Sequence, residues 1–134
     1  GRNKKMNAKF HHLVDLYDVS DRVKVLEYTN KVPELMSISN IVITKPGGLT
    51  TSESLASNLP LILINPIPGQ EEENADFLVR NGVAVLIGKN DNIARVLKNL
   101  YRHPEKIEDM RNHIPALAKP NSTKSICDIL MKSI

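Results

Sequence analysis

The hydrophobic positions of this chain alternate between short apolar runs and longer segments with helical spacing. Runs at 41–44, 61–65 and 83–87 show little polar alternation, which is typical of strands buried on both faces of a sheet. A run at 23–28 is also predicted to be a strand. Apolar residues spaced three and four apart predict helices between and around these runs, at 7–17, 32–38, 50–57, 71–80, 91–101 and 122–131.

Residues that start or stop helices support these boundaries. Asn58 and Pro60 end the helix that begins at position 50, and Gly82 is expected to be the C-cap of the next one. Pro104 is expected to open a further helix as its first residue. Strands and helices that alternate in this way predict an α/β fold, a Rossmann-like parallel sheet with helices on both faces. We expect residues 1–134 to form a single domain.

The composition of the chain excludes some classes of protein but says less about the fold than the pattern of hydrophobic positions. The chain is 41% hydrophobic and 25% charged, and it has no apolar run near the ~20 residues of a membrane span. Its net charge of +3 is spread along the chain without tryptophan, whereas a nucleic-acid surface clusters cations beside stacking rings, so we expect no nucleic-acid partner. The single cysteine, Cys127, excludes an internal disulfide, fits a reducing compartment and is expected to be buried in the last helix.

The segment Thr44-Lys-Pro-Gly-Gly-Leu-Thr-Thr-Ser-Glu53 has the order strand, glycine turn, helix. Such a turn directs the unpaired backbone N–H groups of a helix N-terminus beyond the strand end, where they suit a phosphate. Glu53 suits a pair of sugar hydroxyls better than a phosphate. Two structural alternatives remain open: the glycines can form only a tight connection, and Thr50 can be a helix cap that Glu53 completes as a capping box.

Polar residues also follow the neighbouring predicted strands. Tyr28 and Thr29 come after the first strand, and the loop and helix start at 66–74 come after the third. Ligands of open parallel sheets bind outside the carboxyl ends of strands, so these segments are expected to line one crevice with the glycine turn. The acids at 71–73 also suit an ordinary helix N-terminus, and Tyr28 can be a core or rim aromatic residue. No histidine has a partner at metal-ligand spacing, so we expect no metal site.

Two motifs at this spacing, Ile43-Thr-Lys-Pro-Gly-Gly-Leu-Thr-Thr-Ser-Glu53 and Asn65-Pro-Ile-Pro-Gly-Gln-Glu-Glu-Glu-Asn-Ala75, carry a family resemblance. They closely resemble the processive diacylglycerol β-glycosyltransferases and the plant-type monogalactosyldiacylglycerol synthases, which are related to the lipid-linked N-acetylglucosaminyltransferase of peptidoglycan synthesis. The resemblance runs from Gly1 to at least Val85. It implies the GT-B architecture, in which two Rossmann-like domains face a cleft. This chain would be the C-terminal, donor-binding half, and Gly1-Arg-Asn3 looks like the tail of a first strand that is missing.

The resemblance implies that the glycine turn holds the nucleoside diphosphate of a UDP-sugar. The diphosphate would lie against backbone donors and a hydroxyl group of Gly47, Gly48, Leu49 and Thr50. Glu53 would accept hydrogen bonds from the ribose hydroxyls.

It likewise implies residues for the base and for the sugar. Tyr28 and Thr29 would flank the uracil, mostly through backbone contacts, and hydroxyls of the transferred hexose would be bound by Gln70, Glu71 and Asn74. The peptidoglycan enzyme favours a glutamine where Glu71 stands. This departure favours a plain hexose donor, UDP-glucose or UDP-galactose.

The implied reaction is inverting transfer of the hexose to the hydroxyl of diacylglycerol, without a metal or other cofactor. The helix N-terminus would offset the charge that grows on the leaving diphosphate. The catalytic base and the acceptor site are expected in an N-terminal domain that this chain lacks, so the chain alone should bind donor weakly and catalyse nothing. The full-length enzyme is expected in the cytoplasm, peripheral at the inner face of the cell membrane.

Two other functions stay open. One is a lipid-linked transferase of the peptidoglycan type that uses UDP-N-acetylglucosamine, or a UDP-sugar epimerase of similar architecture with catalytic acids in its own cleft. The other is a non-catalytic interaction domain that keeps the fold but not the site. The presence of Glu53, Gln70 and Asn74 speaks against that second alternative.

Overall fold

The computed structural model describes residues 2–132 of the chain. The chain divides into two compact units, Gly1–Val32 and Pro33–Ile134. All three strands of the described chain belong to the second unit. The expectation of a single domain stays a prediction.

The first unit consists of a helix and an irregular segment. Helix α1, Lys4–Leu16, is capped by Asn3, whose side chain accepts a hydrogen bond from the Met6 N–H at 3.0 Å. The strand predicted at 23–28 is wrong, because these residues form no strand. A segment rich in β-branched residues becomes a strand only where another strand pairs with it, and the described part of this unit contains none.

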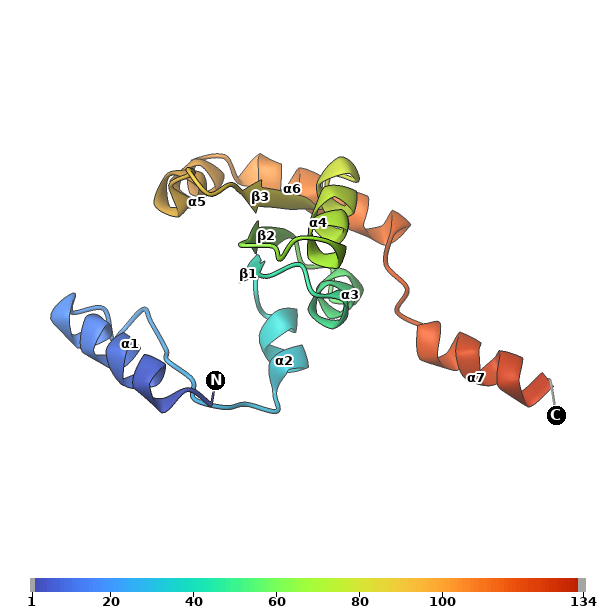
Figure 1. Cartoon of the computed structure of the whole chain (residues 1–134), viewed down its shortest axis with the longest axis horizontal. Coiled ribbons are helices and arrows are strands. Elements are labelled where there is room, and N and C mark those ends of the chain that lie inside the picture. Colours follow the sequence, from blue (N-terminus) through green and yellow to red (C-terminus); the bar gives the residue numbers. More distant parts are fainter. Residues whose placement is uncertain (1, 133–134) are drawn as a thin grey trace. The chain divides into compact units, whose positions relative to one another are not determined.

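The second unit is built on a parallel sheet of three strands in the order β1-β2-β3 (Figure 1). The strands are Val42–Thr44 (β1), Leu61–Ile64 (β2) and Ala84–Ile87 (β3). The central strand β2 pairs with both neighbours, so that Leu63 lies opposite Thr44 on one side and Leu86 on the other. Because the strands are parallel, their carboxyl ends lie at one edge of the sheet, where ligands of such folds bind.

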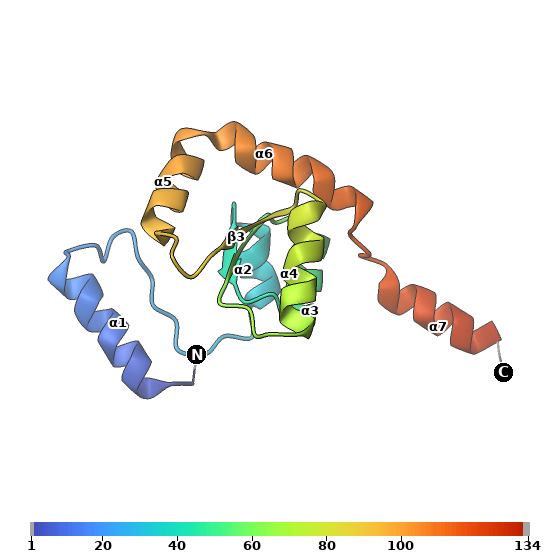
Figure 2. The same cartoon turned by 45° about the horizontal axis from the view of Figure 1, so that its top comes forward.

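Helices cover both faces of this sheet. On one face, Leu61 and Leu63 pack with residues of α3 (Gly48–Ala56), α4 (Gln70–Arg80) and the 3₁₀ turn Ile114–Ala116. On the other face, Ile62 packs with residues of α5 (Ile93–Arg102) and α6 (Pro104–His113). Figure 2 shows α3 and α4 together on one side of the sheet and α5 on the other. Successive residues of β2 thus face opposite helical layers, which confirms the predicted class of fold.

The start of α3 differs from the prediction in a way that affects the site. The helix begins at Gly48, with Gly47 as its N-cap, rather than at Thr50. Thr50 therefore lies inside the first turn, and the capping box considered for Thr50 and Glu53 is not formed. The hydroxyl of Thr50 and the carboxylate of Glu53 are not used to cap this helix.

Left-handed residues end α3 and α4, as the sequence indicates. Asn58 follows α3 with a φ of 54°. The C-cap of α4 is Asn81, and Gly82 comes after it with a φ of 71°, one residue later than expected. Pro104 is the first residue of α6, as predicted.

The remaining helices are α2, Val32–Ser37, and α7, Ser122–Lys132. None of the residues of α7 is buried. Cys127 lies on this helix and is exposed, so the prediction of a buried thiol is wrong. Helical spacing predicts the helix itself, but it does not decide whether another surface covers the apolar side of that helix.

Candidate functional site

The loop after β1 is a tight turn that is stabilised by backbone hydrogen bonding. The Gly47 N–H donates to the Lys45 carbonyl at 2.8 Å, which closes a short turn around Pro46. Pro46 is fully buried, whereas Lys45 is exposed. The turn places the start of α3 directly after the carboxyl end of the edge strand β1.

The N-terminus of α3 is open. The hydrogen-bond ladder begins with the Thr51 N–H donating to the Gly47 carbonyl at 3.0 Å, so the N–H groups of Gly48, Leu49 and Thr50 precede it. No side chain of the described chain caps this helix end. By contrast, the side chain of Asn92 caps α5 by accepting hydrogen bonds from two backbone N–H groups. The start of α3 therefore has donors and a partial positive charge available for an anion.

The fold of the chain does not explain why two glycines stand here. A Cβ atom built on Gly47 or Gly48 would meet no atom within 4 Å, and neither residue has a positive φ. An alanine at either position would therefore fit the structure. Two glycines that sterics do not require, in front of open space, suit a ligand that approaches the backbone closely.

The side chains of the first turns of α3 divide into two groups. Thr51 is turned back into the helix, where its hydroxyl donates to the carbonyls of Gly47 and Gly48 at 2.9 and 3.0 Å. Thr50 is half-buried, and Glu53 is exposed. Neither side chain makes a hydrogen bond to another described residue. The Thr50 hydroxyl and the Glu53 carboxylate are therefore available to a ligand.

Glu53 opens on a groove of about 460 Å³ beside α3. The groove lies between the residues of α3 around Leu49 and Glu53 and a segment that contains Lys119 and Ser122. Leu49 is 84% exposed at the second position of the helix. The groove thus runs beside α3 from near its start to Glu53, about one and a half turns further on.

A second open helix start, that of α4, follows β2. Its N-cap is Gly69, with a φ of 95°, and no side chain of the described chain caps it. Its first turn contains three glutamates, 71–73, whereas the first turn of α3 contains no acid. Like charges repel, so a diphosphate is better placed at α3, and the carboxylates of α4 suit hydroxyl groups.

The three predicted sugar-binding residues of α4 have different surroundings. Gln70 is exposed and makes no side-chain hydrogen bond within the described chain. The carboxylate of Glu71 accepts a hydrogen bond from the Ile67 N–H at 2.8 Å and so stabilises its own loop. Asn74 is half-buried, and its side-chain amide donates to the Pro46 carbonyl at 3.0 Å. The spacing of residues along the chain does not indicate the last two contacts.

The two predicted uracil residues lie in the first unit. Tyr28 is 67% exposed, and the Arg2 guanidinium stacks 5.0 Å from the centre of its ring. The Thr29 hydroxyl accepts a hydrogen bond from the Lys31 N–H at 3.0 Å. Tyr28 is therefore not a core residue, and its exposure is compatible with the other alternative, an ordinary rim aromatic.

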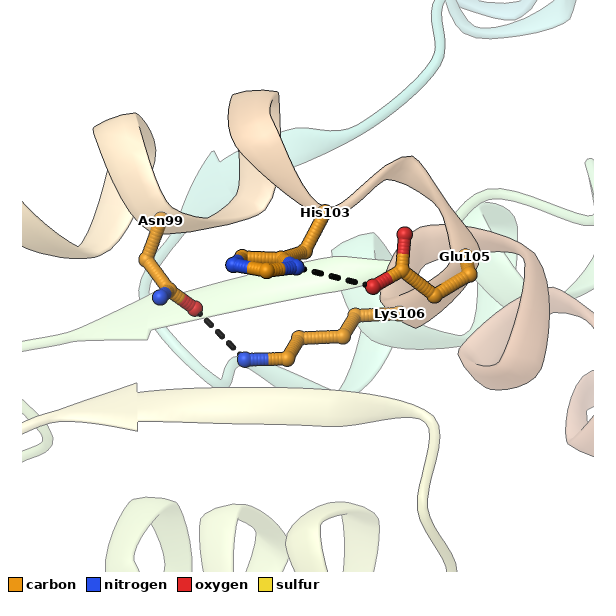
Figure 3. A network of polar contacts seen from close by, with 4 residues as sticks. All are labelled: Asn99, His103, Glu105 and Lys106. Atoms are coloured by element: carbon orange, nitrogen blue, oxygen red, sulfur yellow. Dashed lines mark hydrogen bonds and ion pairs between the residues drawn. The ribbon is translucent and has the colours of Figure 1, made fainter.

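A separate polar network joins α5 to α6 (Figure 3). Lys106 donates to the side chain of Asn99 at 2.8 Å, and His103 Nδ1 lies 2.9 Å from a carboxylate oxygen of Glu105. A hydrogen bond from the residue's own backbone N–H lowers the pKa of Glu105, and His103 lowers it further. These residues line grooves with Gly82 or Val85 rather than with the glycine turn, so the network is not part of the candidate site.

Two further properties of the described residues bear on the site. Within residues 2–132, no group of three or more His, Cys, Asp or Glu side chains is arranged to hold a metal ion. In the same range, no helix has both the length and the apolar character needed to cross a bilayer.

The fold and this edge define a class: a parallel α/β domain whose carboxyl edge presents open helix N-termini and polar side chains. The chain belongs to the family of glycosyl transferases group 1, whose model matches residues 1–116. The prediction of a glycosyltransferase family is thus confirmed.

Relatives in the sequence comparison are similar over most of this chain. The processive diacylglycerol beta-glucosyltransferases of Bacillus pumilus and Bacillus subtilis are each 36% identical over 112 residues, which is 84% of this chain and 29% of each relative. That of Bacillus licheniformis is 32% identical over 134 residues, covering 99% of this chain and 34% of the relative. The chain thus spans about three tenths of the length of these relatives.

A solved structure has the same fold. The crystal structure of the glycotransferase of kitacinnamycin matches with a TM-score of 0.64 at 18% identity, over 87% of this chain and 31% of that chain. At this identity the match shows the fold alone, a portion of a glycosyltransferase.

Proposed function

We propose that this chain is the donor-binding domain of an inverting glycosyltransferase that moves a hexose from a UDP-sugar to diacylglycerol. The observation that carries the proposal is the open start of α3, where Gly47 and Gly48 are not required by the fold and the N–H groups of Gly48, Leu49 and Thr50 precede the helical ladder. The similarity to diacylglycerol glucosyltransferases supports the choice of acceptor.

In this proposal the diphosphate binds at Gly47, Gly48, Leu49 and Thr50. The backbone N–H groups and the Thr50 hydroxyl donate to its oxygens, and the helix dipole offsets its charge. Glu53 accepts hydrogen bonds from both ribose hydroxyls.

The sugar lies at the start of α4. The assignment of the uracil to Tyr28 and Thr29 stays a prediction from the sequence. Gln70, Glu71 and Asn74 bind hexose hydroxyls, and the glutamate at 71, where the peptidoglycan enzyme favours a glutamine, favours UDP-glucose or UDP-galactose. Glu71 Oε2 and Asn74 Nδ2 are engaged within the chain, which leaves Glu71 Oε1 and Asn74 Oδ1 to accept hydrogen bonds from the sugar.

The chemical contribution of this domain is to stabilise the leaving group. As the diacylglycerol hydroxyl attacks the anomeric carbon, the bond from that carbon to the UDP oxygen breaks, and negative charge grows on the diphosphate. Preorganised N–H groups at the start of α3 stabilise this charge in the transition state. The base that removes the proton from the attacking hydroxyl is assigned to the other domain of the full-length enzyme, which acts as a peripheral protein at the cytoplasmic membrane face.

Calorimetric titration of the chain tests the proposal. We expect UDP to bind weakly, with saturation at millimolar ligand, and UDP-glucose or UDP-galactose to bind more tightly than UDP-N-acetylglucosamine. The chain alone should transfer no sugar to diacylglycerol in vesicles, whereas the full-length enzyme should do so. Absence of binding at millimolar UDP would contradict the site, and a preference for UDP-N-acetylglucosamine would favour the peptidoglycan-type alternative.

A further inference from the structure

The side chain of Asn74 joins the two helix starts at the carboxyl edge of the sheet. Its Nδ2 donates to the carbonyl of Pro46, 28 residues earlier in the chain, at 3.0 Å. Asn74 lies in the second turn of α4, whereas Pro46 lies in the turn before α3. The bond is partly buried, so water competes with it less than at an exposed site.

This bond acts on one peptide plane, that between Pro46 and Gly47. The carbonyl oxygen of the plane accepts from Asn74, and its N–H donates to the Lys45 carbonyl at 2.8 Å. A peptide unit is planar, so holding its oxygen and its N–H fixes its orientation. Gly47 and Gly48 form the backbone on the far side of this plane, and a Cβ atom built on either would meet nothing within 4 Å. Glycine has the most conformational freedom of any residue, so this backbone would otherwise be mobile.

The orientation of that plane sets the direction of the donors at the start of α3. The N–H groups of Gly48 and Leu49 follow it directly and precede the hydrogen-bond ladder of the helix. A ligand that needs several N–H groups at once binds more weakly when they must first be ordered. The side chain of Asn74 thus affects a part of the site that its own helix does not form.

From this geometry we propose that Asn74 is a positioning residue for the diphosphate turn, so that it governs the affinity for UDP even when no sugar is attached. The inference rests on the proposed function, because it assumes that UDP binds at the start of α3. It differs from a role in sugar binding alone, which predicts that Asn74 matters only for UDP-hexoses.

Titration of variants with UDP and with UDP-glucose separates the two roles. Asn74→Ala should weaken the binding of UDP about three- to tenfold, the effect expected for one neutral hydrogen bond, and should weaken UDP-glucose at least as much. Gln70→Ala should weaken UDP-glucose and leave UDP unchanged. Asn81→Ala is the matched control: it removes an amide that donates to a carbonyl at 2.8 Å at the other end of α4, and it should change neither affinity.

Asn74→Asp adds a test of the donor itself. The carboxylate has nearly the same shape but no proton to give to the Pro46 carbonyl, so UDP should bind at least as weakly as to the alanine variant. The midpoint of thermal unfolding of each variant shows whether a loss of affinity accompanies a loss of fold. If both variants unfold, hydrogen exchange in the wild-type chain tests the inference instead. The side-chain amide protons of Asn74 should be equally protected from exchange with UDP and with UDP-glucose.

The outcomes separate this inference from the proposed function. If wild type does not bind UDP, the proposed function fails and the inference falls with it. If wild type binds UDP and a folded Asn74→Ala variant binds it equally well, the inference alone is overturned. Protection of the Asn74 amide that develops only when a sugar is present would also overturn it.

Discussion

Replacement of Glu53 by alanine is expected to weaken the binding of UDP about 30- to 150-fold. In the proposed site its carboxylate accepts hydrogen bonds from two ribose hydroxyls, and loss of such charge-assisted bonds costs about 2–3 kcal/mol in total. The side chain is exposed, and α3 should keep its structure, since alanine is the better helix former. Because wild type is expected to saturate only at millimolar UDP, the expected readout is a loss of saturation in calorimetry at those concentrations, and circular dichroism checks the fold.

Two comparisons make the Glu53 experiment specific. Glu53→Gln keeps an acceptor oxygen but loses the charge, so its affinity should fall between those of wild type and Glu53→Ala. Asp76→Asn, on α4, makes the same change of charge at another exposed carboxylate and should leave UDP binding unchanged. In the full-length enzyme, Glu53→Ala should abolish transfer, and unchanged activity would refute the ribose assignment.

Gly48→Ala is expected to weaken UDP binding about tenfold or more while the chain becomes slightly more stable. A Cβ atom on Gly48 meets nothing within 4 Å in the free structure, so the helix should gain about 0.4–1 kcal/mol from the lower entropy of the unfolded chain. The same methyl group would occupy the space in which the diphosphate approaches the backbone, and such overpacking costs about 1–3 kcal/mol. Thermal unfolding and calorimetry measure the two effects.

Gly82→Ala is the matched control, and it should have the opposite pattern. Gly82 has a φ of 71° at the end of α4, where an L side chain costs about 1–2 kcal/mol. This variant should lose stability and keep its affinity for UDP. A Gly48→Ala variant that binds UDP like wild type would contradict the close approach of a ligand to this turn.

The sequence predicts the strands of the sheet well because they are buried on both faces. The unbroken apolar runs around Ile43, Ile62 and Val85 become β1, β2 and β3, and the helices between them follow from their spacing. The run at 23–28 fails because a strand depends on a partner elsewhere in the chain. Local pattern carries no information about that partner.

The site was predictable only where it consists of residues that are close together in the sequence. The glycine turn and the helix after it are local features, so the sequence places them near each other, and the structure adds that α3 starts at its Gly48 with an open N-terminus. The bond from Asn74 to Pro46 joins residues 28 apart and depends on how α4 packs beside α3. No spacing in the sequence indicates which side-chain atoms such packing brings together.

The central claim is that UDP binds at the start of α3, and an NMR titration of the ¹⁵N-labelled chain with UDP tests it most directly. The account predicts that the largest shifts fall on the backbone amides of Gly48, Leu49 and Thr50, whose N–H groups precede the helical ladder. Smaller shifts should follow along α3 to Glu53. An absence of shifts at millimolar UDP, or shifts concentrated at the His103–Glu105 network instead, would contradict it.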